Sequence, residues 1–330
     1  MRNNFLFIFK YIAAYFVVFI HCSFPADMGL IVNAMARFAV PFFFMISGYY
    51  CFGKNNQSIK KKIYKLLKIT VTACLVYMIY QIVQVLPDYQ AVKNLFSNWF
   101  TIKSILKLSI FNGVTMASHL WFMIALLSCY ILMLCISKTK GIKAAYIVFF
   151  LFLVLHLIIQ FIAHYYNKES YYLICRNFWF TGAPFFLLGH YMHKNQDKFI
   201  RISNKTLFAM IVVGEILSVV SIYAWGMKEI YAGTIVAVIA IFCFSLKYPQ
   251  IFSNTKLMTT LKSDYTSFIY IYHPLVISVL FISIVPNIAW SKEFQYIIPI
   301  FVCIITTILA FAFYYIKNLL SKHKKLSLAT

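Results

Sequence analysis

The chain has 330 residues, of which 62% are hydrophobic and 12% are charged. Soluble domains are typically about 45–50% apolar and about 25% charged, so this composition excludes a disordered protein, a coiled coil and an ordinary soluble enzyme. The 30 Lys and Arg against 8 Asp and Glu give a formal net charge of +22, which in a soluble protein would suggest nucleic acid. Because the basic residues lie between long apolar blocks, membrane topology explains this charge better, and we expect no nucleic-acid partner.

Ten apolar blocks are predicted to span a membrane, since about twenty residues cross a hydrocarbon layer ~30 Å thick. They predict an all-α, polytopic helix bundle in contact with membrane lipids, forming one integral-membrane domain over residues 1–330 with no separate soluble domain. The first block lacks the small-residue cleavage pattern of a signal peptide after it, so we expect a retained helix. In chain order the predicted spans are residues 5–22, 30–52, 67–87, 118–136, 144–164, 178–193, 206–225, 230–247, 266–285 and 295–317.

The basic residues predict the orientation of these spans. With the N-terminus and the C-terminus both inside, 21 basic residues fall in inside segments and seven in outside segments. Such an excess is typical of cytoplasmic segments, which favours this N-in, C-in topology. Five tryptophans lie near the predicted outer boundary, as an aromatic belt would: Trp99, Trp121, Trp179, Trp225 and Trp290.

Two further patterns leave alternatives open. The longest predicted outside connection, residues 88–117, fits a short helix on the outer surface and a plain loop equally well. Pro41-Phe42-Phe43 and Pro184-Phe185-Phe186 each open a predicted outside-to-inside helix that ends in glycine. They are either a weak internal repeat or, in a chain with 34 phenylalanines, a coincidence, which we favour.

Motifs of soluble catalysis give no candidate site. The eight cysteines form no CxxC pair and most lie in or beside apolar blocks, so the sequence predicts neither a disulfide framework nor a metal site. The sequence also contains no phosphate-binding glycine loop, zinc-protease motif or serine-hydrolase elbow. The candidates are therefore ionisable side chains at membrane depth, which are costly there and mark function by default.

Lys10 and His21 lie in the first predicted span, eleven residues apart. Eleven residues are close to three helical turns, so both side chains leave the helix on one face, separated by ~16 Å along the axis. Histidine is the side chain best suited to proton transfer near neutral pH. The alternatives are a lysine that extends to the inner interface and a histidine that faces water at a helix end.

Arg37 precedes Pro41 near the outer end of the second predicted span. Arginine stays charged, so it must pair or face a polar cavity. It is predicted to bind an anion or a carbonyl close to His21, and the alternative is an interfacial anchor.

His119 and Trp121 lie at the start of the fourth predicted span. They are either a functional pair or part of an aromatic belt with a histidine that faces water. Glu215 lies in the middle of the seventh span, where a carboxyl is either neutral or paired with a base from another helix.

His273 precedes Pro274, and a backbone carbonyl freed by the proline could accept its proton. His156 has apolar neighbours on all sides, which favours a structural hydrogen bond between helices.

In combination, these residues resemble the acyltransferase 3 family of membrane-bound acyltransferases. Its members carry a charged residue, ten intervening residues and a histidine in their first helix, as Lys10 to His21 do here. Their second helix has an Arg-x-x-Val-Pro-x-Phe-Phe-x-x-Ser-Gly pattern, which Arg37 to Gly48 matches. The His-Leu-Trp-Phe run at 119–122, the Pro-Phe-Phe-Leu-Leu-Gly run at 184–189 and the Tyr-x-x-His-Pro pattern at 270–274 are also similar.

This resemblance implies about ten membrane helices in a bacterial-type plasma membrane, with both termini inside. It implies transfer of an acyl group, usually acetyl from acetyl-CoA, to a hydroxyl of a cell-envelope polysaccharide or a lipid-linked sugar, with no bound cofactor. His21 would be the general base, Arg37 would stabilise the acyl oxygen, and Lys10 would help to hold the donor. Many members have arginine in place of Lys10, and lysine lacks the two-pronged phosphate contact of arginine.

Two other functions fit the same features. A transporter or exporter of sugars or lipid intermediates could use Lys10, His156 and Glu215 for proton coupling, although no inverted repeat is visible. A substrate-binding and transport module of the kind fused to membrane-bound serine racemases is the other alternative. Incorporation of labelled acetyl groups from acetyl-CoA into envelope glycan separates the enzyme from both.

Overall fold

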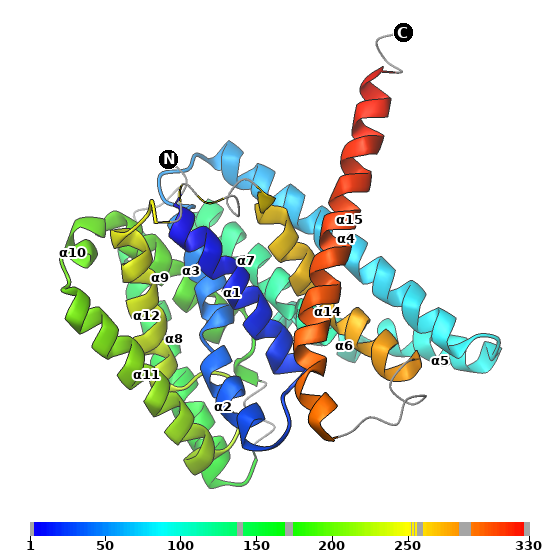
Figure 1. Cartoon of the computed structure of the whole chain (residues 1–330), viewed down its shortest axis with the longest axis horizontal. Coiled ribbons are helices and arrows are strands. Elements are labelled where there is room, and N and C mark those ends of the chain that lie inside the picture. Colours follow the sequence, from blue (N-terminus) through cyan, green and yellow to red (C-terminus); the bar gives the residue numbers. More distant parts are fainter. Residues whose placement is uncertain are drawn as a thin grey trace. The chain divides into compact units, whose positions relative to one another are not determined.

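The computed structural model describes residues 3–136, 141–168, 174–251, 253, 255, 260–283 and 292–326 (Figure 1). All regular elements in these ranges are helical, which confirms the predicted all-α class. The chain divides into two compact units, the first made of Met1–Ala39 with Tyr248–Thr330 and the second of Val40–Lys247. The first unit thus combines the two ends of the chain.

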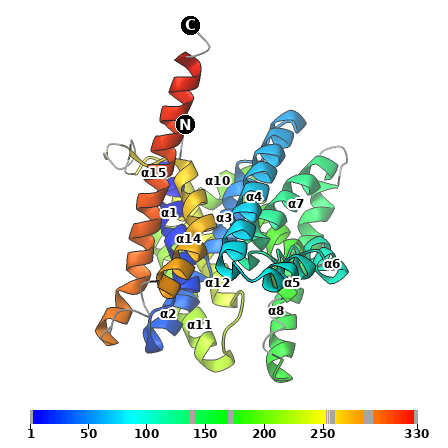
Figure 2. The ribbon, with the colours of Figure 1, turned by 90° about the vertical axis from the view of Figure 1, so that its right-hand side faces the viewer.

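The first unit is built around α1, which packs against α2, α14 and α15. Figure 2 shows α14 and α15 side by side next to α1. Asn3 begins α1 because its side chain accepts a hydrogen bond from the amide of Leu6 at 2.9 Å, which satisfies one of the unpaired amides of the first turn. The helices of this unit are α1 (Asn4–His21), α2 (Ala26–Ala36), α14 (Ser263–Ser283), η5 (Lys292–Tyr296) and α15 (Ile298–Leu326).

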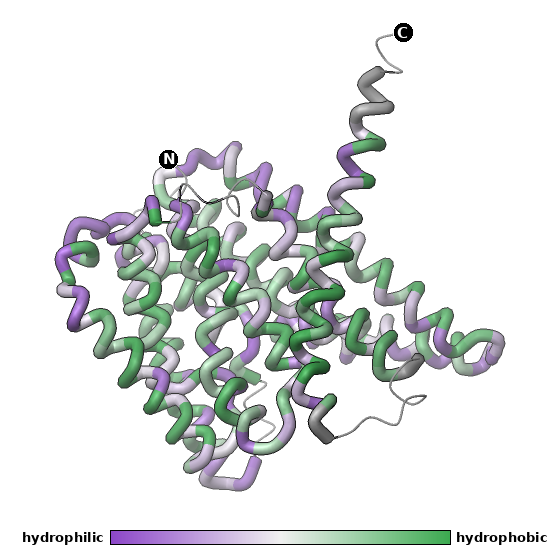
Figure 3. The backbone as a smooth tube through the Cα atoms, in the orientation of Figure 1, coloured by the Kyte–Doolittle hydropathy of each residue, from purple (hydrophilic) through white to green (hydrophobic). Residues whose placement is uncertain are grey.

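The second unit holds the remaining helices, of which α11 and α12 form the most extensive pair. Its elements in chain order are α3 (Ala39–Tyr49), α4 (Asn56–Val85), α5 (Tyr89–Trp99), α6 (Ile102–Phe111), η1 (Ser118–Leu120), α7 (Trp121–Ile136), α8 (Ile142–Tyr165), η3 (Phe178–Gly182), α9 (Ala183–Lys194), α10 (Gln196–Ile200), α11 (Asn204–Trp225) and α12 (Ala232–Lys247). Figure 3 shows that α4 changes from hydrophilic in its lysine-rich first turns to hydrophobic further along, the pattern of a helix that enters a membrane at its first end.

Seven helical segments of the described chain are long and apolar enough to cross a membrane, and one of them combines α2 and α3. The predicted count of ten is therefore not confirmed. The predicted span 178–193 corresponds to α9, which has 12 residues and continues from the π-helical η3, and the span 230–247 corresponds to the 16 residues of α12. The predicted span 266–285 extends past the end of α14 into residues outside the described ranges.

Two of the tryptophans predicted to form the outer aromatic belt are packed inside the protein. Trp99 and Trp121 are buried, whereas Trp179 and Trp225 are half exposed. Trp290 lies outside the described residues. Trp99 packs inward because its indole N–H donates to the side-chain oxygen of Gln81 at 3.2 Å. For the first two tryptophans, packing within the protein replaces the predicted belt role.

Residues 88–117 contain two helices, α5 and α6, which favours the surface-helix alternative over a plain loop (Figure 2). The side chain of Asp88 caps the first of them and that of Thr101 caps the second. Apolar side chains of α6 remain largely exposed, with Ile102 at 79% and Ile105 at 56%. An exposed apolar stripe on a short helix is typical of a segment that lies in a membrane interface.

The two helices that begin with Pro-Phe-Phe, α3 and α9, pack against each other. The sequence left open whether their similarity is a repeat or a coincidence, and it did not predict this contact. A Cβ atom on Gly48 of α3 would overlap the carbonyl oxygen of Phe186, and one on Gly189 of α9 would overlap that of Met45. Gly48 therefore contacts the backbone of Phe186, three residues before Gly189, and Gly189 contacts the backbone of Met45, three residues before Gly48. Small residues at a crossing allow such close approach of membrane helices.

We expect Gly48→Ala to lower the thermal unfolding temperature of the detergent-solubilised protein. The added methyl group would meet backbone that cannot move aside, and overpacking of this kind costs about 1–3 kcal/mol. The matched control is Gly182→Ala, whose methyl group would meet the Phe44 ring at 3.3 Å, a contact that a side chain can relieve. Equal melting temperatures for both variants would contradict this account of the crossing.

Candidate functional site

Helix α1 carries Lys10 and His21 without interruption, as their predicted shared face requires. Lys10 is half-buried within the helix, and His21 is its last residue and is exposed. The amide of Cys22 closes the helix by bonding to the carbonyl of Val18 at 2.8 Å. The imidazole of His21 therefore projects from a fixed helix end, with Lys10 about three turns away along the same face.

His273 of α14 lies directly beside His21. The two ring centroids are 5.0 Å apart with the planes inclined at 51°, and the His273 side chain is fully buried. Each histidine was a candidate from the sequence. Their contact was not predicted, because 252 residues separate them in the chain. Imidazole carries a proton donor and a proton acceptor on different nitrogens, so each ring of this pair can give or take a proton.

A backbone hydrogen bond fixes the orientation of His273. Its Nδ1–H donates to the carbonyl oxygen of Ile269 at 3.0 Å. The predicted acceptor was a carbonyl freed by Pro274, which would be that of Tyr270, so the observed acceptor lies one residue earlier. With the proton on Nδ1, the neutral ring carries its lone pair on Nε2.

Arg37 is buried where α2 ends, and it has a partner that the sequence reading missed. The side-chain oxygen of Asn33 accepts from Nε at 3.0 Å and from Nη2 at 2.6 Å, and each residue is 4% exposed. Two bonds from one guanidinium to one oxygen fix the plane of the group. Asn33 is not ionisable, so a pattern of charged groups does not reveal it. Its position four residues before Arg37 on a helix is the sequence signal that indicates this contact.

The end of α2 lies against the middle of α1. The ring of Phe38 packs on that of Phe16 at 5.4 Å, edge to face. Phe16 precedes His21 by five residues, which is about 7–8 Å of helix. The first unit thus contains Lys10, His21, His273 and the Asn33–Arg37 pair, with the arginine buried and the helix-end histidine exposed.

His119 and Trp121 belong to the second unit and are each 5% exposed. The ring of His119 packs edge to face on Tyr77 of α4 at 5.1 Å, and Trp121 packs against Phe44 of α3 at 6.2 Å. This burial disagrees with the alternative of a belt with a water-facing histidine. It places both side chains in the packing between α4, α7 and α3.

Glu215 is half-buried on α11, next to Gly214, which lies in backbone contact with Gly233 of α12. Among the described residues, no hydrogen bond or ion pair joins Glu215 to another side chain, so the predicted partner from another helix is not found there. Gly214 lies in the crossing of α11 and α12. Successive residues of a helix are turned by about 100°, so the carboxyl of Glu215 projects beside this crossing.

His156 of α8 is fully buried, and its Nδ1–H donates to the carbonyl oxygen of Phe180 in η3 at 3.0 Å. The predicted structural hydrogen bond between helical segments is confirmed.

The comparison with known families decides what kind of protein this is. The family Acyl_transf_3, described as an acyltransferase domain, matches residues 3–316. The chain belongs to the acyltransferase 3 family. Seven helical segments among the described residues are long and apolar enough to cross a membrane, which indicates an integral-membrane member of this family.

Two curated proteins share parts of the sequence. An amino-acid racemase from Enterococcus faecalis is 31% identical over 156 residues, which cover 43% of this chain and 20% of the racemase. A serine/alanine racemase from Enterococcus gallinarum is 38% identical over 91 residues, which cover 24% of this chain and 13% of that protein. The similarity thus spans a fifth or less of each relative. No solved structure matches the chain.

Proposed function

We propose that this protein is an O-acyltransferase, and more specifically an O-acetyltransferase, that moves the acyl group of acyl-CoA to a hydroxyl of a cell-envelope polysaccharide or a lipid-linked sugar. The observation that supports this reaction best is the pairing of His21 with His273 in the unit that also buries Arg37. A proton acceptor and a fixed guanidinium are the two groups that acyl transfer to a hydroxyl requires.

In the proposed reaction, His21 accepts the proton of the acceptor hydroxyl as its oxygen attacks the thioester carbonyl. Arg37 stabilises the negative charge that develops on the carbonyl oxygen, in the orientation that Asn33 gives it. The carbon–sulfur bond then breaks, and the CoA thiolate takes the proton from His21. The products are an O-acyl ester and free CoA, and His273 positions the His21 ring throughout.

The donor is proposed to run lengthwise along α1. Its nucleotide stays on the basic inner side, and the acyl-bearing arm extends outward toward His21, about 16 Å beyond Lys10. An acyl group would thus pass from an inside donor to an outside acceptor within the protein, in a plasma membrane of bacterial type.

Vesicles test this proposal directly. Inside-out vesicles that contain the enzyme are supplied with radiolabelled acetyl-CoA, and the label is expected on a lumenal glycan or lipid-linked sugar. Vesicles with equal amounts of His21→Ala protein are the control and should stay unlabelled. Label confined to acceptors on the outer face of these vesicles would contradict the lengthwise path, and no transfer at all would contradict the proposed reaction.

We expect Lys10→Glu to raise the KM for acyl-CoA and to change acceptor binding much less. A carboxylate at this position would repel the phosphates of CoA, whereas the ammonium attracts them. Steady-state kinetics with each substrate varied in turn measure the two constants. Lys10→Arg is the matched control and should retain a low KM, and equal KM values for all three proteins would show that Lys10 takes no part in donor binding.

The proposed topology places both termini and residues 54–66 inside and residues 88–117 outside. Gln57 and Gln90 are both exposed, and this topology predicts that they lie on opposite sides of the membrane. In a cysteine-free background, Gln90→Cys in intact cells should react with an impermeant thiol reagent and Gln57→Cys should react after lysis alone. The reverse pattern would overturn the N-in assignment.

A second candidate is a substrate-binding and transport module for a soluble catalytic partner. The similarity to two racemases favours it. In the vesicle experiment, uptake of a small amino acid with no acyl transfer would support this module, or a transporter, in place of the enzyme.

A further inference from the structure

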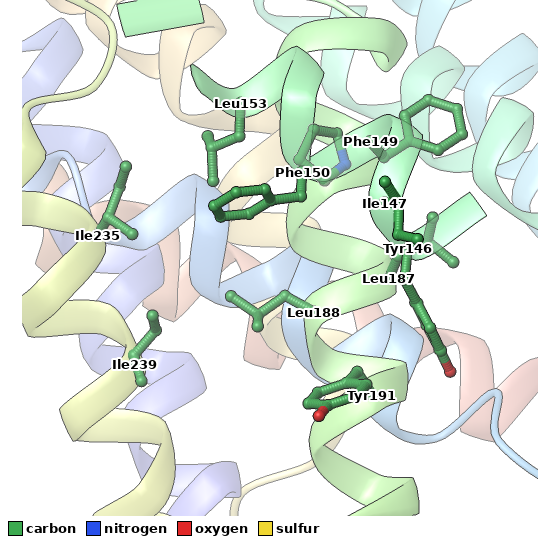
Figure 4. A pocket seen from close by; sticks show the side chains of 11 residues that line it. Tyr146, Ile147, Phe149, Phe150, Leu153, Leu187, Leu188, Tyr191, Ile235 and Ile239 are labelled. Carbon is green, nitrogen blue, oxygen red and sulfur yellow. The ribbon is translucent and has the colours of Figure 1, made fainter. Parts of the chain in front are cut away.

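An apolar groove lies in the second unit where α8, α9 and α12 meet (Figure 4). Its volume is about 380 Å³, within the range of ~300–1,000 Å³ that ligand pockets occupy. In Figure 4, Ile235 and Ile239 of α12 face Phe150 of α8 and Leu188 of α9 across the open space. None of the described residues that line the groove carries a formal charge.

The α8 wall of the groove belongs to a helix that is long and apolar enough to span the membrane and is mostly unburied. Ile147 and Phe150 of this wall are 64% and 63% exposed. A groove with such a wall opens sideways into the hydrocarbon of a bilayer, where the available ligands are alkyl chains.

One end of the groove is polar. Tyr146 and Tyr191 lie there with their hydroxyl groups pointing to the same end (Figure 4), and the Tyr146 hydroxyl bonds to Nδ1 of His190 at 2.7 Å. The start of α8 therefore meets the end of α9, so the two helices run antiparallel along the groove. An alkyl chain in the groove would bring its headgroup to this end.

Two exposed lysines flank the tyrosines on the same helices, outside the residues that line the groove. Lys143 precedes Tyr146 by three residues and Ile147 by four on α8, so it continues the lining face of that helix. Lys194 follows Tyr191 by three residues at the end of α9 and continues its lining face in the same way. Both lysines thus lie about one helical turn beyond the tyrosines, on the side of the polar end of the groove.

We propose that the groove binds one alkyl chain of an anionic phospholipid from the surrounding bilayer, with the lipid phosphate held between Lys143 and Lys194. The apolar walls select a hydrocarbon chain, and the two cations select a negative headgroup over a zwitterionic one. A phospholipid is the occupant because it surrounds the open side of the groove in large excess.

The chain-binding part is tested with native mass spectrometry of the purified, full-length protein titrated with phosphatidylglycerol. Leu188→Trp fills the middle of the groove and should abolish retention of the tightly held lipid. Leu151→Trp is the matched control, since Leu151 is 59% exposed on α8 outside the groove lining. Unchanged retention in Leu188→Trp, or equal loss in both variants, would overturn the assignment of the groove.

The headgroup part is tested with the double variant Lys143→Gln/Lys194→Gln. We expect its preference for phosphatidylglycerol over phosphatidylcholine to fall about 30-fold, as loss of two cations worth about 1 kcal/mol each predicts. Lys198→Gln/Lys205→Gln removes the same charge from positions off the groove and should keep the preference. These surface changes leave packing intact, so they test the proposal even if Leu188→Trp fails to fold.

A competition distinguishes the lipid source. Polyprenyl phosphate added at an equimolar amount should displace little phosphatidylglycerol from the wild-type protein. Its complete displacement would show that the groove binds a lipid-linked acceptor and would overturn the phospholipid assignment, as would equal binding of both phospholipids.

Discussion

His21→Ala and His21→Gln are expected to abolish acyl transfer while the protein stays folded. The exposed imidazole at the end of α1 is the proposed general base, and loss of such a group lowers rates by about 10²–10⁴-fold. The measurement is the transfer of labelled acetyl groups in membranes that contain equal amounts of each protein, with fluorescence-detected size-exclusion chromatography to verify folding.

His273→Gln provides the comparison for this result. Its ring lies 5.0 Å from that of His21 and is proposed to position it, so the variant should retain part of the activity and show a changed pH profile of kcat/KM. A merely structural role would lower the amount of folded enzyme and leave that profile unchanged. Near-normal turnover by folded His21→Ala would contradict the assignment of the base.

Arg37→Lys is expected to lower kcat by about 10²–10³-fold although the positive charge is kept, the range seen when a donor to a developing oxyanion is removed. A single ammonium cannot bond to Asn33 at two points and also direct a donor at the carbonyl oxygen. Single-turnover kinetics with bound acyl-CoA isolate the chemical step from donor binding.

The Asn33 variants separate orientation from charge. Asn33→Leu removes the acceptor that fixes the guanidinium and should lower kcat more than it raises KM. Asn33→Asp keeps a side-chain oxygen at the same position and should restore part of the loss. If Arg37→Lys has full activity, Arg37 is an interfacial anchor and the Asn33 contact has no catalytic consequence.

Local patterns predicted the features that depend on one helix at a time. The apolar blocks predicted helices, and the eleven-residue spacing of Lys10 and His21 placed both on one uninterrupted helix. The hydrogen bond of His156 followed from its apolar surroundings, since a buried polar group needs a partner.

Features that depend on contacts distant in sequence could not be predicted in this way. The partner of Arg37 is a neutral side chain, which a search for charges passes over, and the pairing of His21 with His273 joins the two ends of the chain. Hydropathy likewise cannot distinguish a tryptophan at a lipid interface from one held by a neighbouring glutamine, as Trp99 is by Gln81.

The hydrogen bond from His273 to its own helix limits what this residue can do with a proton. A proton wire needs imidazoles that receive on one nitrogen and release from the other, and the Nδ1–H of His273 is directed at the carbonyl of Ile269. A proton that reaches its Nε2 has no onward route through the opposite side of the ring. His273 is therefore suited to positioning the neighbouring His21 ring for chemistry at a single site and unsuited to carrying a proton current across the bilayer.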